Sequence, residues 1–300
     1  MSDRHVEKYK VITLSITTKR GRLYRFDDVI KRSELSNSEL DHFLTGGYIH
    51  LLPFTQKFDL IKESNTVNNG LDSVIAVVPF WKRPEVSMVF WQNALDIGLK
   101  VIAIISPGDE DNHRLASKYA FDIVFCENTL GDKWQRGIER LKVHCFDYAL
   151  IIGSDDIISH KYFNDLNERY LKNSTQYIGL LDALAISSES KKARYFKGYD
   201  NYRSGESIGS GRLIHLIALR KINFQCFPLK KKRGMDYYLH NKLKNAGITN
   251  TLIKSDLKPY RLGLKVTSSI TANIKNSPFI YDIPLEDYYS DKVINMINNL

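Results

Sequence analysis

The chain has 300 residues, of which 43% are hydrophobic, and its formal net charge is +9 at neutral pH. This length accommodates one large domain, or a large domain with a small appendage. The positive charge favours anionic partners such as nucleic acid, nucleotide phosphates or an acidic surface. The three cysteines are scattered and odd in number, which excludes a disulfide framework and favours a reducing compartment. The start is polar, and no run approaches the roughly 18 apolar residues of a membrane span. We therefore expect a cytoplasmic protein.

Residues 1–54 have the pattern of a small, basic, β-rich module. The runs 11–16 and 23–26 are rich in strand-forming residues and frame a turn, so they predict a hairpin. Four basic side chains cluster around it: Lys19, Arg20, Arg22 and Arg25. They form either a grip for a phosphate backbone or a solvated charged loop. Residues 55–71 have little periodicity and are expected to be a linker.

Strands and helices alternate from residue 72 to the end of the chain. Apolar runs predict buried strands at 74–78, 101–105, 122–126 and 147–153. Helical periodicity separates them, beginning at Pro84, near residue 110 and near residue 131. This alternation predicts an α/β domain over 72–300 with a doubly wound, mostly parallel sheet. Residues 187–212 are dense in basic, tyrosine, glycine and serine residues, and they predict a long functional loop.

The strand expected at 147–153 is followed by two adjacent carboxylates, Asp155 and Asp156. In open α/β sheets, ligands bind beyond the carboxyl ends of the strands. Two like charges at the end of a buried strand repel each other, so we expect a counter-charge from outside the chain, and a divalent cation is the simplest. The alternative is an Asp-rich turn that caps the next helix.

Two common nucleotide-binding motifs are missing from the chain. The loop after the first predicted strand, Pro79–Arg83, contains no glycine, and no Gly–Lys–Ser/Thr phosphate loop occurs. Dinucleotide-dependent hydride transfer and P-loop chemistry are therefore disfavoured.

Three short motifs follow one another in an order that resembles the nucleotide-binding half of GT-A-fold glycosyltransferases, especially the inverting family 2 type. They are Arg83–Glu85, Asn128 with the segment 130–137, and Gly153–Asp156, and the resemblance covers roughly residues 73–245. It implies a GT-A-like fold and a glycosyltransferase, hexosyl or pentosyl, that uses a nucleotide-sugar donor. Ser154 stands where the family has the first acid of its Asp-x-Asp triplet, which leaves the number of metal ligands open.

The resemblance assigns roles in donor binding to residues of the predicted strand ends. Pro79, Trp81 and Arg83 would line the nucleotide pocket, and Asp109 would lie near the base or ribose. Lys133 would lie near the uracil or the diphosphate of a UDP-sugar. Without the resemblance, Trp81 is equally explained as a packing aromatic, and Arg83 and Lys133 as surface charges.

The same resemblance assigns the metal and the base. Asp156 would hold Mn²⁺ or Mg²⁺ against the diphosphate, and Asp155 would contact the ribose or share the metal. Asp236, at the start of a predicted helix, would be the carboxylate that takes the acceptor's proton. Met235 replaces the Glu of the family's Glu–Asp pair, and Asp236 is equally explained as a helix N-cap. His240, one turn later, would either join a metal site or be structural.

Two further segments have side chains suited to anions. The segment Arg203–Arg212 holds three glycines, whose backbone amides would approach phosphate or sugar oxygens, and we include Arg212 among the donor-binding residues. A flexible surface loop is the alternative. The basic run Lys230–Arg233 precedes Asp236 and would bind a polyanionic acceptor, unless it is a solvated charge run.

The acceptor separates the remaining functions. Basic clusters in both parts of the chain suit hydroxymethylated bases in bacteriophage DNA, flipped from the stack, which would place the enzyme in the host cytoplasm. Aromatic residues that would stack on such a base are Tyr195, Phe196, Tyr199 and Tyr202. The rivals are a glycan or lipid-linked acceptor, nucleotidyl transfer, and a non-catalytic nucleic-acid-binding protein with a degenerate transferase core.

Overall fold

The computed structural model describes residues 71–300 except 128, 172, 188–191, 266–278 and 281–282. Before residue 71 it describes the short stretches 8–11, 15–17, 23–25, 29–31, 35–36, 38–39, 42 and 49–51. The chain divides into two compact units, Met1–Thr66 and Val67–Leu300. The module and linker boundaries expected at residues 54 and 71 stay predictions.

The first unit contains two small antiparallel sheets. In one, β1 (Lys8–Val11) lies between β4 (Val29–Lys31) and β5 (Ile49–Leu51). In the other, β2 (Ser15–Thr17) pairs with β3 (Leu23–Arg25), which is the hairpin expected from the sequence. The basic residues Lys19, Arg20 and Arg22 of its turn lie outside the described residues, as does the side chain of Arg25, so the phosphate-binding role stays a prediction.

The second unit is built on a seven-stranded sheet with the order β15-β11-β14-β9-β6-β7-β8. Its strands are β6 (Val74–Phe80), β7 (Lys100–Ile105), β8 (Asp122–Phe125), β9 (Tyr148–Ile151), β11 (Tyr177–Leu180), β14 (Arg212–His215) and β15 (Thr251–Ile253). The first four strands are parallel, and β11 is parallel to β15. Only β14 runs antiparallel to its neighbours β9 and β11 within this sheet. The predicted α/β class with a doubly wound, mostly parallel sheet is confirmed.

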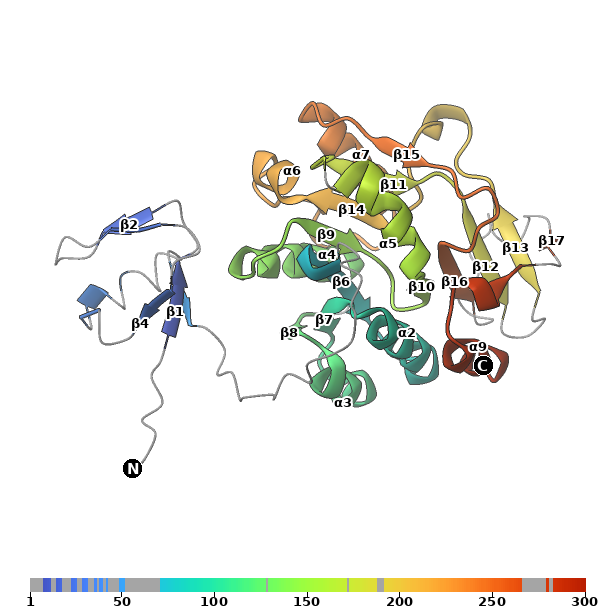
Figure 1. Cartoon of the computed structure of the whole chain (residues 1–300), viewed down its shortest axis with the longest axis horizontal. Helices are drawn as coiled ribbons and strands as arrows, with labels where there is room; N and C mark the ends of the chain where they lie inside the picture. Colours follow the sequence, from blue (N-terminus) through green and yellow to red (C-terminus); the bar gives the residue numbers. More distant parts are fainter. Residues whose placement is uncertain are drawn as a thin grey trace. The chain divides into compact units, whose positions relative to one another are not determined.

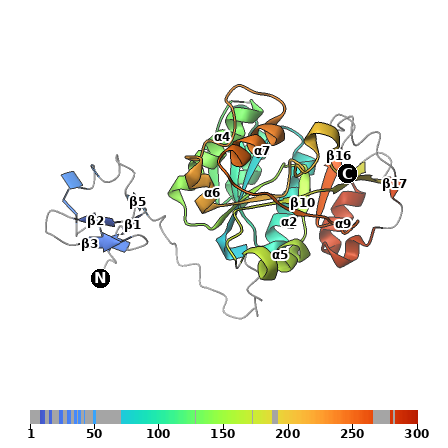
Figure 2. The same ribbon diagram turned by 90° about the horizontal axis from the view of Figure 1, so that it is seen from above.

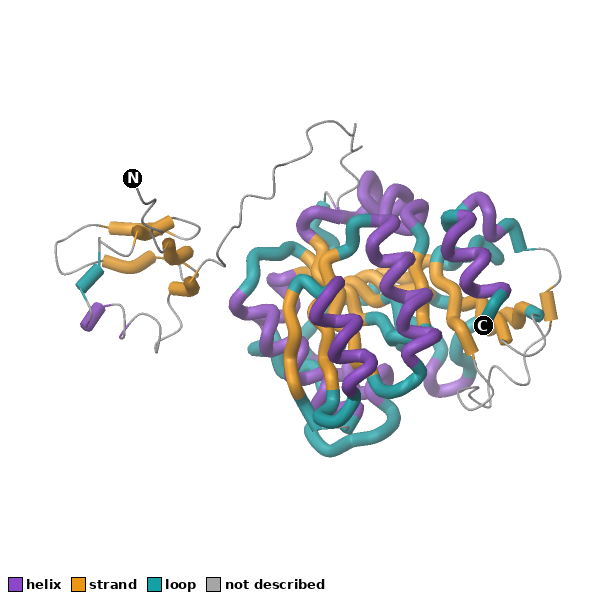
Figure 3. Tube along the Cα trace, turned by 90° about the horizontal axis from the view of Figure 1, so that it is seen from below, coloured by secondary structure: helices purple, strands orange, loops and turns teal. Residues whose placement is uncertain are grey.

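Helices cover both faces of this sheet because its strands are buried on both sides. Successive residues alternate between faces. Ile75 and Val77 of β6 belong to the hydrophobic cluster that includes residues of α4, α6 and α7, whereas Val74, Ala76 and Val78 belong to the cluster that includes residues of α2, α3, α5 and α9. These helices are α2 (Pro84–Ile97), α3 (Glu110–Tyr119), α4 (Leu130–Arg140), α5 (His160–Leu166), α6 (Leu216–Lys221), α7 (Met235–Asn245) and α9 (Asp291–Asn298). Figure 2 shows α4, α6 and α7 on one side of the strands, with α2 and α5 on the other. Figure 3 shows helices packed across the strands from below.

Short helical segments complete the domain. They are the 3-10 turns Leu71–Ser73, Leu141–Val143, Asn201–Arg203 and Leu285–Asp287, and the π-helical turn Asn167–Leu171 that extends α5. In the part of the chain that the structure describes, no helix combines the length and the apolar character needed to cross a bilayer.

Two glycines of α4 allow the close packing that shapes the site. A Cβ on Gly137 would lie 2.3 Å from Val77 Cγ1, so the glycine lets α4 rest directly on β6. A Cβ on Gly131 would lie 2.2 Å from the carbonyl oxygen of Pro228. The backbone N–H of Gly131 also donates to the carbonyl of Lys231 at 2.9 Å. The basic run 230–233 is thereby held against the start of α4.

The second unit also contains a sheet of five strands, which lies beside the seven-stranded sheet (Figure 1). Its order is β10 (Asp156–Ile158), β16 (Arg261–Lys265), β12 (Ala183–Ser187), β13 (Ala193–Phe196) and β17 (Phe279–Ile280). Because β13 belongs to it, the expectation of one long loop over 187–212 was wrong in part. β13 pairs with its neighbour in the sequence, β12, and with the distant strand β17. The short run Ala193–Phe196 carries no clear strand pattern of its own, so its place in a sheet depends on these partners. Asp156 is the first residue of β10, so the chain passes from one sheet to the other at the acid pair.

Candidate functional site

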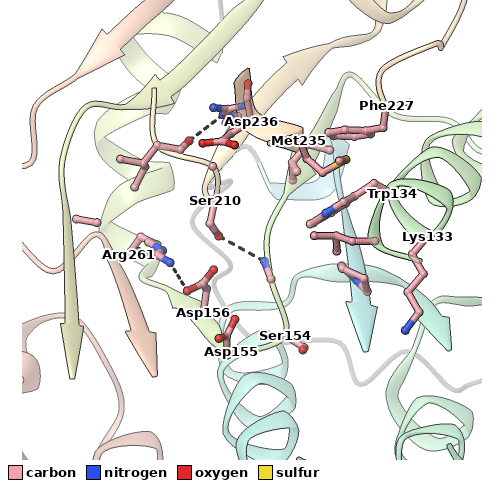
Figure 4. A pocket seen from close by; sticks show the side chains of 18 of the residues that line it. Lys133, Trp134, Ser154, Asp155, Asp156, Ser210, Phe227, Met235, Asp236 and Arg261 are labelled. Carbon is pink, nitrogen blue, oxygen red and sulfur yellow. Dashed lines mark hydrogen bonds and ion pairs between the residues drawn. The ribbon is translucent and has the colours of Figure 1, made fainter. Parts of the chain in front are cut away.

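A cavity of about 670 Å³ opens beyond the carboxyl ends of β6 and β9, where the two sheets and helices α4 and α7 meet (Figure 4). This is the edge at which the sequence predicts ligand binding. The residues expected in the site that line this cavity are Pro79, Trp81, Arg83, Lys133, Asp155, Asp156, Arg212 and Asp236. Asn128, which belongs to the family motif, lies outside the described residues.

Asp109 is the expected site residue that does not line the cavity. It is buried at the start of α3, where one carboxylate oxygen accepts the backbone N–H of Lys82 at 2.8 Å and the amide of Asn112 at 2.9 Å. Lys82 and Arg83 both have a positive φ, near 53°, which costs energy for residues other than glycine. Asp109 therefore stabilises the turn that presents Trp81 and Arg83, and its expected place near the base or ribose stays a prediction.

Lys133 also stabilises the turn that follows β6, through contacts with Phe80 and Trp81. Its side chain is buried on α4, its Nζ donates to the carbonyl of Phe80 at 2.5 Å, and it lies 5.3 Å from the ring centroid of Trp81. Burial lowers the pKa of Lys133 to about 8, against the opposing effect of Asp109. The surface-lysine alternative is excluded by this burial. The hydrogen bond to Phe80 and the contact with Trp81 fix the end of β6 next to the cavity.

The acid pair is matched by three cations of the same chain. One oxygen of Asp156 accepts from Nη2 of Arg261, with Lys265 Nζ 3.6 Å away. One oxygen of Asp155 accepts from Lys265 Nζ at 2.9 Å, with Arg83 Nη1 at 3.5 Å. Burial would raise the pKa of Asp155, but Lys265 and Arg83 outweigh it and hold the pKa at about 2. Both carboxylates are thus built into an ion-pair network.

Strand β16 supplies two of these cations because its side chains alternate. Arg261, Gly263 and Lys265 share one face, while Leu262 and Leu264 enter the core on the other. Gly263 pairs with Asp156 in the ladder, and a Cβ there would lie 3.2 Å from the Asp156 carboxylate and 3.0 Å from Lys265 Cε. The glycine therefore leaves room for the ion pairs.

Asp236 lies in the first turn of α7 and faces the same cavity (Figure 4). Its Oδ2 accepts from the hydroxyl of Tyr199 and from Nη2 of Arg203, the latter at 2.7 Å. Burial would raise the pKa of Asp236, but these two hydrogen bonds outweigh it and lower the pKa below its ordinary value. The group is ionised at neutral pH. Among the described residues no donor reaches Oδ1, which leaves that oxygen for a ligand hydroxyl.

Two arginines hold this carboxylate in place. Arg203 also pairs with the buried Glu206 at 2.8 Å and lies 3.5 Å from the centroid of the Tyr199 ring. Arg212 is fully buried and donates to the carbonyls of Ile208, Ser207 and Asp236 at 2.7–3.0 Å. Its guanidinium fastens the glycine-containing loop to the start of α7. Arg212 thereby positions the start of α7. Since it also lines the cavity, the donor contact expected from the sequence stays a prediction.

Several residues that shape the site were missed at the sequence level. Arg261, Lys265 and the pairing of Arg203 with Asp236 were not foreseen, although the alternation Arg–Leu–Gly–Leu–Lys in β16 is a recognisable signal of a half-buried strand. The hydroxyl of Tyr199 donates to Asp236, which the sequence did not reveal, and the expected stacking of its ring on a base stays a prediction. His240 has a buried Nδ1 without a partner among the described residues. No cluster of three or more potential metal-binding side chains occurs within those residues.

Comparisons with known proteins give structural likeness at low identity. No family model and no curated protein matches the chain. S. aureus TarS 1–349 in complex with UDP-GlcNAc has 13% identity and a TM-score of 0.47, covering 75% of this chain and 65% of that chain. A longer TarS structure has 11% identity and a TM-score of 0.47, covering 64% of this chain and 37% of that chain. CMP:2-keto-3-deoxy-manno-octonic acid synthetase with CTP has 12% identity and a TM-score of 0.41, covering 61% and 89%. Because all of these TM-scores are below 0.5, a functional assignment has to be argued from the cavity residues themselves.

Proposed function

We propose that the chain is a glycosyltransferase that moves a sugar from a nucleotide-sugar donor to an acceptor hydroxyl. One observation carries this proposal: a single cavity at the carboxyl edge of the sheet holds an aromatic and cationic end and a carboxylate end. Trp81 and Arg83 with Lys265 form the first, and Asp236 forms the second. The first suits a nucleoside diphosphate, and the second suits an acceptor hydroxyl that must lose a proton.

The donor's base and diphosphate would use different side chains of the cavity. Aromatic rings supply a stacking surface, since Trp81, Trp134 and Phe227 all line it, the last two 5.7 Å apart between ring centroids. The diphosphate would lie against Arg83 and Lys265. The guanidinium of Arg83 and the ammonium of Lys265 have further N–H donors beyond those used on the acid pair. Such fixed cations favour the negative charge that develops on the leaving phosphate.

Asp236 would act as the general base of an inverting transfer. The acceptor hydroxyl donates to Oδ1, and its oxygen attacks the anomeric carbon as the bond to the β-phosphate oxygen breaks. The proton passes to Asp236, and the electron pair of the broken bond leaves with the nucleoside diphosphate. Tyr199 and Arg203 hold the carboxylate ionised and oriented for this step. Its location at the start of α7 and in the cavity favours this role over a simple helix cap, since no N-cap bond from Asp236 is present.

An anionic acceptor is favoured by the rim of the cavity. Lys230, Lys231, Lys232 and Arg233 are exposed, and Lys232 also lines the cavity. Duplex DNA with hydroxymethylated bases is therefore the first acceptor to test, with an acidic glycan as the rival. Binding to DNA that neither weakens with salt nor depends on these four charges would reject the DNA version.

The test of the proposal is a thermal-shift screen with UDP-GlcNAc, UDP and CTP, in EDTA and in Mn²⁺. Ligand binding to the native state raises its melting temperature by mass action. We expect a shift with a nucleotide-sugar, lost in Trp81→Ala and retained in Tyr202→Ala, an exposed aromatic outside the cavity lining. A shift with CTP alone would favour nucleotidyl transfer. No shift with any nucleotide would reject both and favour a non-catalytic protein.

A further inference from the structure

The acid pair at the end of β9 has its counter-charges within the chain. Lys265 Nζ lies 2.9 Å from an Asp155 oxygen and 3.6 Å from an Asp156 oxygen, so one ammonium bridges the two carboxylates. Arg261 forms a second ion pair with Asp156, and Arg83 is a third cation, paired with Asp155. Two carboxylates against three cations leave an excess of one positive charge before any ligand binds.

This arrangement is built in by burial and backbone pairing. The side chains of Arg261 and Lys265 are only 7% and 9% exposed. The β10–β16 ladder sets Gly263 opposite Asp156, with the two cations on either side of it on the same face of β16. Buried charges of this kind are costly to separate, because each partner would remain without compensation in a low-dielectric environment. The ion pairs are therefore a persistent part of the fold.

A divalent cation does not fit this set of residues. Mn²⁺ or Mg²⁺ requires several oxygen ligands with a surplus of negative charge. The acid pair together with its three cations has a surplus of positive charge instead. The position between the two carboxylates, where a shared metal would bind, is taken by the Lys265 ammonium. The metal that the sequence assigns to Asp156 is thus disfavoured by the ion pairs themselves.

We propose that Lys265, together with Arg83, replaces the divalent cation: it binds the donor diphosphate and stabilises the leaving nucleoside diphosphate, so that donor binding and transfer need no metal. This inference rests on the proposed function. Lys265 has three N–H donors, of which the two carboxylates use at most two, and Arg83 is 32% exposed at the cavity. The proton released by the acceptor goes to Asp236.

The experiment is a calorimetric titration of the whole chain with UDP and UDP-GlcNAc, in EDTA and in Mn²⁺. We expect the affinities in the two conditions to agree within about threefold. Lys265→Met should weaken UDP binding in EDTA by about 10- to 100-fold, because a hydrogen bond from a charged donor is lost. Lys265→Arg should retain most of the affinity. Lys244→Met, which removes an exposed lysine of α7, is the matched control and should bind as the wild type does.

A second measurement separates this inference from the proposed function. Mn²⁺ is titrated into the ligand-free protein and followed by electron paramagnetic resonance. We expect no Mn²⁺ binding at the acid pair in the wild type. We expect a gain of binding in the double variant Arg83→Met/Lys265→Met, where the two carboxylates face Arg261 alone and keep a surplus of negative charge. Binding in the wild type that disappears in Asp156→Asn would overturn the inference, as would a tenfold or larger gain in UDP affinity with Mn²⁺. If no nucleotide binds at all, the proposed function fails, and the Mn²⁺ titration still decides whether Lys265 occupies a metal position.

Discussion

Asp156 and Asp236 face one cavity, at the bottom and the top of Figure 4, in different electrostatic surroundings. Asp156 is 5% exposed and shares three cations with Asp155, whereas Asp236 is 20% exposed and shares Arg203 with Glu206. The guanidinium of Arg212, close to Asp236, is taken up by backbone carbonyls. The first end therefore attracts an anion, while the second keeps a carboxylate that can accept a proton. The number of cations paired with each carboxylate therefore separates the two roles that we propose for Asp156 and Asp236.

The largest expected effect tests the proton-accepting end. Asp236→Asn should lower kcat by about 10²- to 10⁴-fold, the usual contribution of a general base, and leave donor binding intact. Steady-state kinetics with calorimetric donor binding measure both quantities. Tyr199→Phe, which removes one hydrogen bond to the same carboxylate, should cost much less. Loss of donor binding in Asp236→Asn, with no separate loss of rate, would contradict a base and indicate a purely structural acid.

The next effect tests the ion-paired end. Arg261→Met removes the guanidinium that pairs with the buried carboxylate of Asp156. We expect the free energy of unfolding to fall by about 3–5 kcal/mol, because the buried charge loses this partner. Denaturant unfolding measures it. Arg220→Met is the matched control, because Arg220 is exposed in the last turn of α6, and its effect should stay within about 0.5 kcal/mol. Equal effects of the two substitutions would show that the Asp156 pair contributes little.

Acid should weaken the ion-paired end in a defined direction. Burial raises the pKa of Asp155, but Lys265 and Arg83 outweigh it, so its folded pKa of about 2 lies below that of an unfolded Asp. Its ionised form then stabilises the fold by about 2 kcal/mol above the unfolded pKa, and this contribution is lost as the pH falls toward about 2. The stability gap between the wild type and Asp155→Asn should therefore shrink as the pH is lowered. A gap that is constant with pH would contradict the ion pairs.

The smallest effect compares a glycine at each end. Gly263→Ala crowds Lys265 Cε and the Asp156 carboxylate at 3.0 and 3.2 Å, and we expect a loss of about 1 kcal/mol, typical of mild overpacking. Gly209→Ala meets Asp236 Cβ at an ordinary 3.5 Å and should be tolerated. Chemical unfolding of both variants measures the difference. A larger loss for Gly209→Ala would show that the looser packing belongs to the Asp155–Asp156 end.

The sequence by itself determined the sheet and the places of the acids. Hydrophobic periodicity is local, so the strands near 74–78, 101–105, 122–126 and 147–153 and the helices between them were predictable, and with them the edge where Asp155 and Asp156 lie. The helix that begins next to Asp236 was predictable for the same reason, whereas the role of Asp236 as a base came from the resemblance to the glycosyltransferase family. These features depend on residues a few positions apart.

Only the tertiary structure decided what the acids face. Arg261 and Lys265 lie 105 and 110 residues along the chain from Asp156 and Asp155, and Tyr199 lies 37 residues from Asp236. Their contacts depend on the pairing of β10 with β16 and on the loop that Arg212 fastens to α7. Local propensity carries no information about such partners, because the second sheet forms only when distant strands pair. Our proposal that Lys265 takes the place of a metal at Asp156 therefore depends on β16, which places two cations there.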